Sequence, residues 1–155
     1  MKLSIRSSQH EDSAGHKGTI ETGGVQWMCA GRGSEHLGVL VRQVFSSPLY
    51  ILVIHAEMPV HTPGQPDPKG LQLWVDLPKQ YKMVEPSYQE LGPQEIPEAF
   101  PEGPDGGVKI RVISGKSHGI ESPVRPLGGC WFFHIIFKKK ATIFQPIRTC
   151  VCSLV

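Results

Sequence analysis

In parts of this sequence apolar residues alternate with polar ones at a period of two, and no stretch shows the spacing of an amphipathic helix. The alternation is clearest in residues 71–77 and 108–112. Because side chains two apart on a strand share a face, each stretch predicts a strand with one apolar face. The 17 glycines and 14 prolines among 155 residues suit short strands joined by turns. We therefore expect one all-β domain.

The rest of the chain fits the same fold class. Val25–Cys29 is a strand candidate entered through two glycines, and the apolar runs 37–45 and 49–54 are separated by a Ser-Ser-Pro turn. Residues 78–103 contain several prolines and predict a loop or short extended pieces. A Pro-Asp-Gly-Gly turn precedes the strand expected at 108–112.

The last third of the chain differs in composition. Residues 130–137 are almost wholly apolar, so they must be buried on both faces or become prone to aggregation. Three lysines follow, which we interpret as solubilising the end of a strand rather than as a nuclear signal. Cys150 and Cys152 could bind zinc with Cys130 and His134. Free thiols are the preferred interpretation, because structural zinc sites usually have tighter paired spacings.

Charge and hydropathy limit the partners. The formal net charge of +2 is too small for a dedicated nucleic-acid-binding protein. The longest apolar region, residues 37–54, is interrupted by Arg42, Gln43 and Pro48 and makes a poor membrane span. Residues 1–9 lack the apolar stretch of a signal peptide, so the four cysteines predict reduced intracellular thiols. We expect no direct nucleic-acid binding and no membrane association.

His55 and Glu57 are the candidate metal ligands. On a strand, this spacing places an imidazole and a carboxylate side by side. An open iron site is typically built from two histidines and one carboxylate, and the sequence holds no compact His-x-His pair to complete it. His10 and His16 could supply a third imidazole, but we expect these two and His61 to be solvent-exposed loop residues.

Several segments together resemble the pirin family of the cupin superfamily. In chain order they are His10-Glu11-Asp12, Gly15-His16-x-Gly18, Gln26-Trp27-Met28-x-Ala30-Gly31-Arg32-Gly33, His55-Ala56-Glu57-Met58-Pro59, Gly70–Leu77 and Lys82–Leu91. A looser match continues to Ser122, and Gln145-Pro146-Ile147 is a faint echo. The order and exactness of the segments carry the resemblance.

The resemblance implies a double-sheet jelly-roll barrel, one of two in tandem in the family, with iron in the N-terminal barrel. The family binds this iron through a His-x-His pair and a later His-x-Glu pair, which corresponds to His55 and Glu57. The implied cofactor is Fe(II) or Fe(III). Arg32 is equally consistent with a contact beside the metal and with a surface turn. Trp27 and Trp74 are expected to line the core or a cavity, with stacking on a flavonol ring as an alternative.

Departures from the family pattern predict an incomplete, single partial barrel. The strands that carry the His-x-His pair are expected upstream of residue 1, and the second barrel is expected to be absent. Residues 34–54 separate the Gly-Arg-Gly motif from His55, where the family gap is short, so we interpret them as an insertion. His36 stands at the family spacing as an alternative ligand, with Gly38 in the place of the carboxylate.

These considerations predict a partial pirin-like cupin domain at residues 1–122 and a divergent tail at 123–155 that is poorly ordered or loosely packed. The first functional hypothesis is a nuclear, redox-sensitive transcription cofactor that binds iron and is found in nucleus and cytoplasm. Its partner would be a transcription factor or another nuclear protein. The alternative is a quercetin 2,3-dioxygenase acting on a flavonol. A third hypothesis is a truncated product without function, because half of the metal site is missing. No catalytic residue is assigned.

Overall fold

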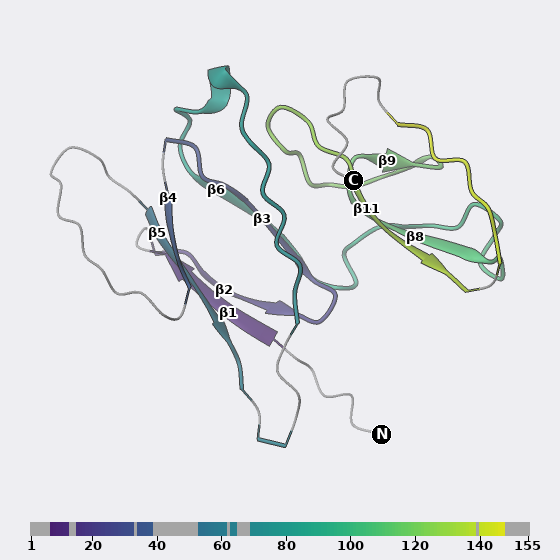
Figure 1. The fold of residues 1–155 in the computed structure, drawn as a ribbon, viewed down its shortest axis with the longest axis horizontal. Helices are drawn as coiled ribbons and strands as arrows, with labels where there is room; N and C mark the ends of the chain where they lie inside the picture. Colours follow the sequence, from purple (N-terminus) through teal and green to yellow (C-terminus); the bar gives the residue numbers. More distant parts are fainter. Residues whose placement is uncertain are drawn as a thin grey trace, which may run out of the picture. The chain divides into compact units, whose positions relative to one another are not determined.

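Every regular element that the computed structural model describes is a β-strand, apart from one 3-10 helix, η1 (Lys79–Tyr81) (Figure 1). The described residues are 7–12, 15–32, 34–38, 53–61, 63–64, 69–138 and 140–147, with backbone alone at 34–38 and 53–54. They fall into two compact units that divide between Pro93 and Gln94. The predicted all-β fold class is confirmed.

The first unit contains two sheets. One has the strand order β2-β1-β5-β4, in which only the β4–β5 pairing is parallel. Its strands are β1 (Ser7–Asp12), β2 (Lys17–Glu21), β4 (Ser34–Gly38) and β5 (Val53–Pro59). The second sheet pairs β3 (Val25–Cys29) with β6 (Ser87–Leu91) in antiparallel fashion. The strand predicted at Val25–Cys29 is confirmed.

The register of β1 and β5 places four polar side chains on one face of the larger sheet. His10 is opposite Glu57, and Asp12 is opposite His55. Directly opposed residues of an antiparallel pair share a face, as do residues two apart on one strand. The four residues therefore form the corners of a square, and this square positions the candidate site.

Buried side chains in the first unit are mostly polar. Among its described residues, only His10, Asp12, Cys29 and His55 are buried. Three of the four carry nitrogen or carboxylate groups, whose burial is costly unless they are hydrogen-bonded. Within the described residues, the interior of this unit is thus a polar cluster rather than an aliphatic core.

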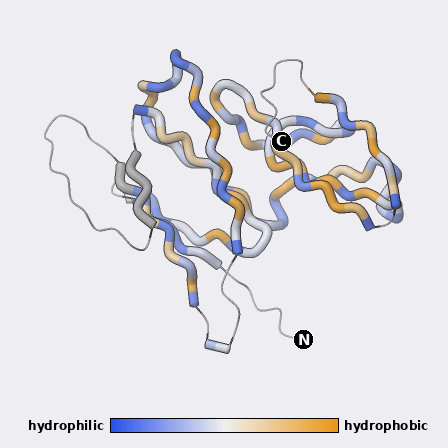
Figure 2. Tube along the Cα trace, in the orientation of Figure 1, coloured by the Kyte–Doolittle hydropathy of each residue, from blue (hydrophilic) through white to orange (hydrophobic). Residues whose placement is uncertain are grey.

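The second unit has an apolar core. Its larger sheet has the order β11-β8-β7, and β9 and β10 form a small antiparallel pair. The strands are β7 (Glu98–Ala99), β8 (Val108–Ser114), β9 (Lys116–Ser117), β10 (Ile120–Glu121) and β11 (Phe132–Phe137). Ala99, Val108, Ile110 and Val112 are buried together, and Figure 2 shows hydrophobic residues along β8 and β11. The strand predicted at 108–112 is confirmed.

The aromatic run of the predicted tail forms an edge strand of this sheet. β11 pairs with β8, and Phe133 and Ile135 pack against the core, while Phe137 is exposed. Ile136, on the opposite face from these three residues, is half-buried and His134 beside it is exposed, so the run is only partly covered on either face. The two compact units divide at Pro93 and Gln94, not at residue 122. The predicted boundary at residue 122 marks where the family resemblance ends, and it stays a prediction.

The strand predicted at residues 71–77 is wrong. These residues are all described and belong to no sheet. Side chains of both parities are exposed, including Leu71 at 85% and Trp74, and Figure 2 shows hydrophobic and hydrophilic residues alternating along the segment. A period-two pattern becomes a strand only where a neighbouring strand supplies hydrogen bonds and a surface covers the apolar face. No strand in the described part of the chain does so here.

Residues 39–52 lie outside the described part of the chain, so the proposed insertion at 34–54 stays a prediction. Its first residues form β4. No helix among the described residues is both long and apolar enough to cross a bilayer. Cys29 and Cys130 are free thiols, whereas Cys150 and Cys152 lie outside the described residues, and the zinc alternative is therefore untested.

Candidate metal centre

His55 and Glu57 lie side by side on β5. The Nε2 atom of His55 is 3.7 Å from Oε1 of Glu57. The His55 side chain is only 1% exposed, whereas the Glu57 side chain is 37% exposed and is partly open to solvent. Metal–ligand distances to nitrogen and oxygen are short, roughly 2.0–2.2 Å for zinc. His55 Nε2 and Glu57 Oε1 can therefore both reach one cation after a small adjustment. The predicted pair is brought together.

The other ring nitrogen of His55 faces the second sheet. The Tyr88 hydroxyl, from β6, lies 3.5 Å from His55 Nδ1, and the two ring centroids are 5.7 Å apart. The same hydroxyl is hydrogen-bonded to Asp12. Tyr88 therefore links the two opposed residues of the β1–β5 ladder, and sequence reasoning missed this role.

The Asp12 carboxylate is buried and strongly hydrogen-bonded. Burial alone would raise its pKa. Hydrogen bonds from Tyr88, from the His16 backbone N–H and from the His16 imidazole outweigh burial, and with the charge of His16 they lower the pKa to about 2. Both His16 contacts measure 2.9 Å. Asp12 is therefore ionised at neutral pH.

Tyr88 shows the complementary effect. Burial raises the pKa of its hydroxyl, and the hydrogen bond to Asp12 and the charges of Asp12 and Glu90 raise it further. A phenol beside two carboxylates keeps its proton, because the phenolate would add a third negative charge. The hydroxyl is therefore a stable hydrogen-bond donor in this cluster.

The prediction that His10 is a solvent-exposed loop residue is wrong. His10 lies on β1 and is 3% exposed. Its Nδ1 is 2.9 Å from Gln26 Nε2, its Nε2 is 2.7 Å from Glu90 Oε1, and its ring centroid is 5.7 Å from that of His55. A Cβ at Gly18 would collide with this imidazole and with Glu90. The ring of His10 is contacted by Gln26 on β3 and Glu90 on β6, and this contact with the second sheet is not evident from the sequence pattern alone.

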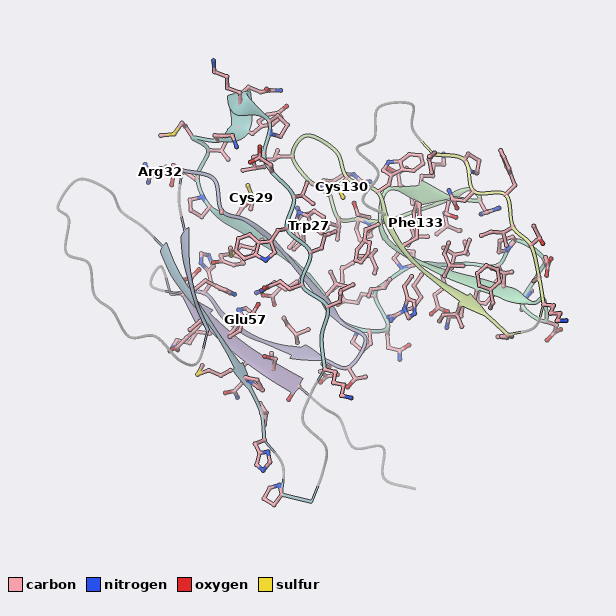
Figure 3. All side chains as sticks on the ribbon, in the orientation of Figure 1. Trp27, Cys29, Arg32, Glu57, Cys130 and Phe133 are labelled. Carbon is pink, nitrogen blue, oxygen red and sulfur yellow. The ribbon has the colours of Figure 1, made fainter. Side chains whose placement is uncertain are left out.

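The remaining predicted residues lie around this cluster. His16 and His61 are exposed, as expected, although the His16 ring also lies 5.0 Å from that of Tyr88. Arg32 follows β3 and forms an ion pair with Glu85 at 2.8 Å. Figure 3 shows Arg32 and Glu57 apart from each other, and a role for Arg32 beside a metal stays a prediction.

His36 is aligned with His55 in the parallel β4–β5 pairing. Its side chain lies outside the described part of the structure. Its role as an alternative ligand therefore stays a prediction.

Glu57 is also connected to the exposed segment after β5. Gln72 Nε2 donates a hydrogen bond of 3.4 Å to Glu57 Oε2, and Trp74 Nε1 donates one of 3.2 Å to Gln72 Oε1. The Trp74 ring is exposed, whereas Trp27 on β3 is half-buried. The prediction that Trp74 lines the core is therefore wrong, because the segment that carries it is not covered.

The donor pair suits iron as part of a site. An imidazole nitrogen beside a carboxylate oxygen is two thirds of the two-histidine, one-carboxylate set of open iron sites. Within the described residues no group of three His, Cys, Asp or Glu side chains is arranged to hold a metal. An ion bound here would take its remaining ligands from water or from groups outside the described residues.

Comparison with known proteins identifies relatives of most of this chain. The Pirin family model matches residues 7–48. Pirin-like protein 2 of Arabidopsis thaliana is 40% identical over 138 residues, which are 89% of this chain and 35% of that protein. Pirin of Homo sapiens is 42% identical over 118 residues, which are 76% of this chain and 32% of that protein. The chain belongs to the pirin family. It spans about a third of the length of these two pirins.

Solved structures agree on the fold of this pirin-family chain. GK1651 from Geobacillus kaustophilus matches with a TM-score of 0.62 and 34% identity, over 84% of this chain and 42% of the other. A quercetin 2,3-dioxygenase from Acinetobacter baumannii matches with a TM-score of 0.53 and 31% identity, over 78% and 35%. The described strands form open sheets rather than a closed barrel. The predicted partial cupin-type jelly roll is confirmed.

Proposed function

We propose that this chain is a pirin-like iron-binding protein that acts as a redox-sensitive transcription cofactor in the nucleus and cytoplasm. The observation that carries the proposal is the 3.7 Å separation of His55 Nε2 and Glu57 Oε1 beside a buried polar cluster. The corresponding His-x-Glu pair is expected to hold iron in the family. The relatives named Pirin support the assignment to this class.

The chain's own residues have distinct tasks in this proposal. His55 is held between Tyr88 and Glu57 and provides a buried nitrogen. Glu57 provides a carboxylate oxygen that is partly open to solvent. A bound iron ion would supply a change of charge with its valence, and such a local change becomes a signal when it biases a surface that a partner contacts.

The route from Glu57 to the surface is short. Gln72 bridges the Glu57 carboxylate and the exposed indole of Trp74. A change of charge at Glu57 alters the hydrogen bond that Gln72 donates and so the position of Trp74. We propose that a transcription factor or another nuclear protein reads the segment around Trp74, with no direct contact to nucleic acid.

Metal analysis tests the iron proposal. The chain is loaded with Fe(II) under anaerobic conditions and desalted, and bound iron is measured per chain. We expect stoichiometric iron in the wild type and in His61→Ala, which removes an exposed histidine, and loss of iron in His55→Ala and Glu57→Gln. Iron that is absent from the wild type, or retained by His55→Ala, contradicts the proposal. An aggregated or protease-sensitive wild type supports instead the hypothesis of a truncated product without function.

The partner proposal is tested with the iron valence as the variable. Chains loaded with Fe(II) and with Fe(III) are compared for retention of a purified transcription factor. We expect retention to differ between the two states and to fall in Trp74→Ala. Equal retention in both states would remove the redox role.

A quercetin 2,3-dioxygenase activity is the second candidate, favoured by the solved structure of that name. The exposed Trp74 indole, linked to Glu57 through Gln72, is a surface on which a planar flavonol could stack. Oxygen uptake with quercetin should exceed that of free Fe(II) and should fall in Trp74→Ala. Uptake equal to that of free Fe(II) excludes this activity.

A further inference from the structure

The two buried imidazoles of the first unit, His10 and His55, have different hydrogen-bond partners. We propose that Tyr88 and Gln26 fix them in opposite tautomers, so that His55 presents an unprotonated Nε2 to a metal while His10 does not. Tyr88 and Asp12 are then positioning residues for the ligand. The inference adds detail to the proposed iron site. Only its metal-binding test rests on that proposed function, because the tautomers are measured in metal-free protein.

The chain of contacts from Asp12 to His55 sets the proton of His55. A carboxylate can only accept hydrogen bonds, and Asp12 is ionised, so the Tyr88 hydroxyl donates its one proton to Asp12. The phenolic oxygen is then left as an acceptor toward His55 Nδ1, 3.5 Å away. His55 must carry its proton on Nδ1, and Nε2, which faces Glu57, carries the lone pair that binds a metal.

The contacts of Gln26 give His10 the opposite arrangement. The Gln26 amide nitrogen is 2.9 Å from His10 Nδ1 and 2.9 Å from Glu90 Oε1. The reversed amide would place its carbonyl oxygen against the Glu90 carboxylate, two acceptors with no proton between them, so the nitrogen donates to both groups. His10 Nδ1 is an acceptor, and the ring proton sits on Nε2, beside Glu90.

The two adjacent imidazole rings therefore have different roles toward a metal. A protonated Nε2 has no lone pair for a metal, so His10 is not a substitute for a missing histidine ligand although it lies on the same face as His55. Its Nε2 is 2.7 Å from Glu90, at an angle outside that of a hydrogen bond. His10 therefore packs beside the site without binding the metal, while His55 is the ligand.

Nitrogen NMR tests the assignment without any metal. Long-range proton–nitrogen spectra of histidine-labelled, metal-free protein are recorded well above the ordinary histidine pKa of about 6.5. We expect His55 to be protonated at Nδ1 and His10 at Nε2. In Tyr88→Phe, which keeps the ring and loses the hydroxyl, His55 should shift toward the Nε2-protonated form. Tyr81→Phe, a matched loss of a hydroxyl on η1, should change neither ring.

Fe(II) titration supplies the second arm. Loss of the partner that orients a ligating histidine typically weakens metal binding by roughly 10–100-fold, and we expect this loss in Tyr88→Phe but not in Tyr81→Phe. A wild-type His55 protonated at Nε2, or a folded Tyr88→Phe with an unchanged His55 tautomer, overturns the inference. If the wild type shows the expected tautomers and binds no Fe(II), the tautomer assignment holds and the iron proposal fails.

Discussion

Asp12 lies directly opposite His55 in the antiparallel pairing of β1 and β5, and the Tyr88 hydroxyl from the facing sheet contacts both side chains. This relationship joins the two sheets of the first unit through polar contacts. Residues that hold the unit together are therefore the residues that surround the candidate ligand. Substitutions in this cluster are expected to affect stability and metal binding together.

Asp12 should make the chain less stable in acid. Its pKa falls from 3.8 to about 2 on folding, so its contribution is complete above pH 3.8 and is lost as the pH falls through 2. At 1.36 kcal/mol per pKa unit, this corresponds to about 2 kcal/mol of the free energy of unfolding. Urea denaturation at a series of pH values measures the loss.

The control separates Asp12 from general acid denaturation. Asp12→Asn should be less stable at neutral pH and should show a flatter dependence on pH in this range. Asp105→Asn, in an exposed turn of the second unit, should retain the wild-type dependence. An Asp12→Asn protein with the full wild-type loss between pH 4 and pH 2 would refute the assignment.

Gly18→Ala should destabilise the first unit. A methyl group at this position of β2 meets the His10 imidazole and the Glu90 carboxylate, and overpacking of this kind typically costs about 1–3 kcal/mol. Gly70→Ala is the matched control, because a Cβ there meets nothing within 4 Å. Thermal denaturation should show a lower Tm for Gly18→Ala alone, and equal Tm values for the two variants would contradict the packing described.

Ile110→Ala should destabilise the second unit. Ile110 is fully buried at the centre of β8, among the core residues of that unit, and truncation of a buried isoleucine typically costs about 2–5 kcal/mol. Ile147→Ala makes the same chemical change at an exposed position and should have little effect. The free energies of unfolding of the two variants provide the comparison, and similar losses would argue against this core.

Cys130 should alkylate more slowly than an ordinary thiol. Burial raises the pKa of its thiol, so a smaller fraction is thiolate at neutral pH, and the thiolate is the form that reacts. Iodoacetamide labelling followed by peptide mass spectrometry gives the rate for this residue. A rate equal to that of glutathione would show that the thiol is more exposed and more acidic than the structure indicates.

Local pattern was sufficient to predict some strands and insufficient for others. β3 and β8 combine β-prone residues with flanking glycines, and both form where expected. Residues 71–77 have an equally clear alternation yet belong to no sheet. The difference is tertiary, because a strand needs a partner edge that the alternation itself does not specify.

For the candidate site too, the local sequence pattern predicted some features and not others. The His55 and Glu57 pair follows from spacing on one strand. His10 and Asp12 have the same spacing, which could have indicated a second polar face. Their burial, and the contacts with Tyr88 and Gln26, depend on how β1 pairs with β5 and on which sheet faces them. No feature of the sequence near His10 reports these pairings.

The most direct test of the metal centre is an anomalous difference map, recorded at the iron absorption edge, from crystals of the Fe(II)-loaded chain. The account predicts a single strong peak within bonding distance of both His55 Nε2 and the Glu57 carboxylate. A peak at any other residues, or side chains of His55 and Glu57 that point away from each other, would contradict it.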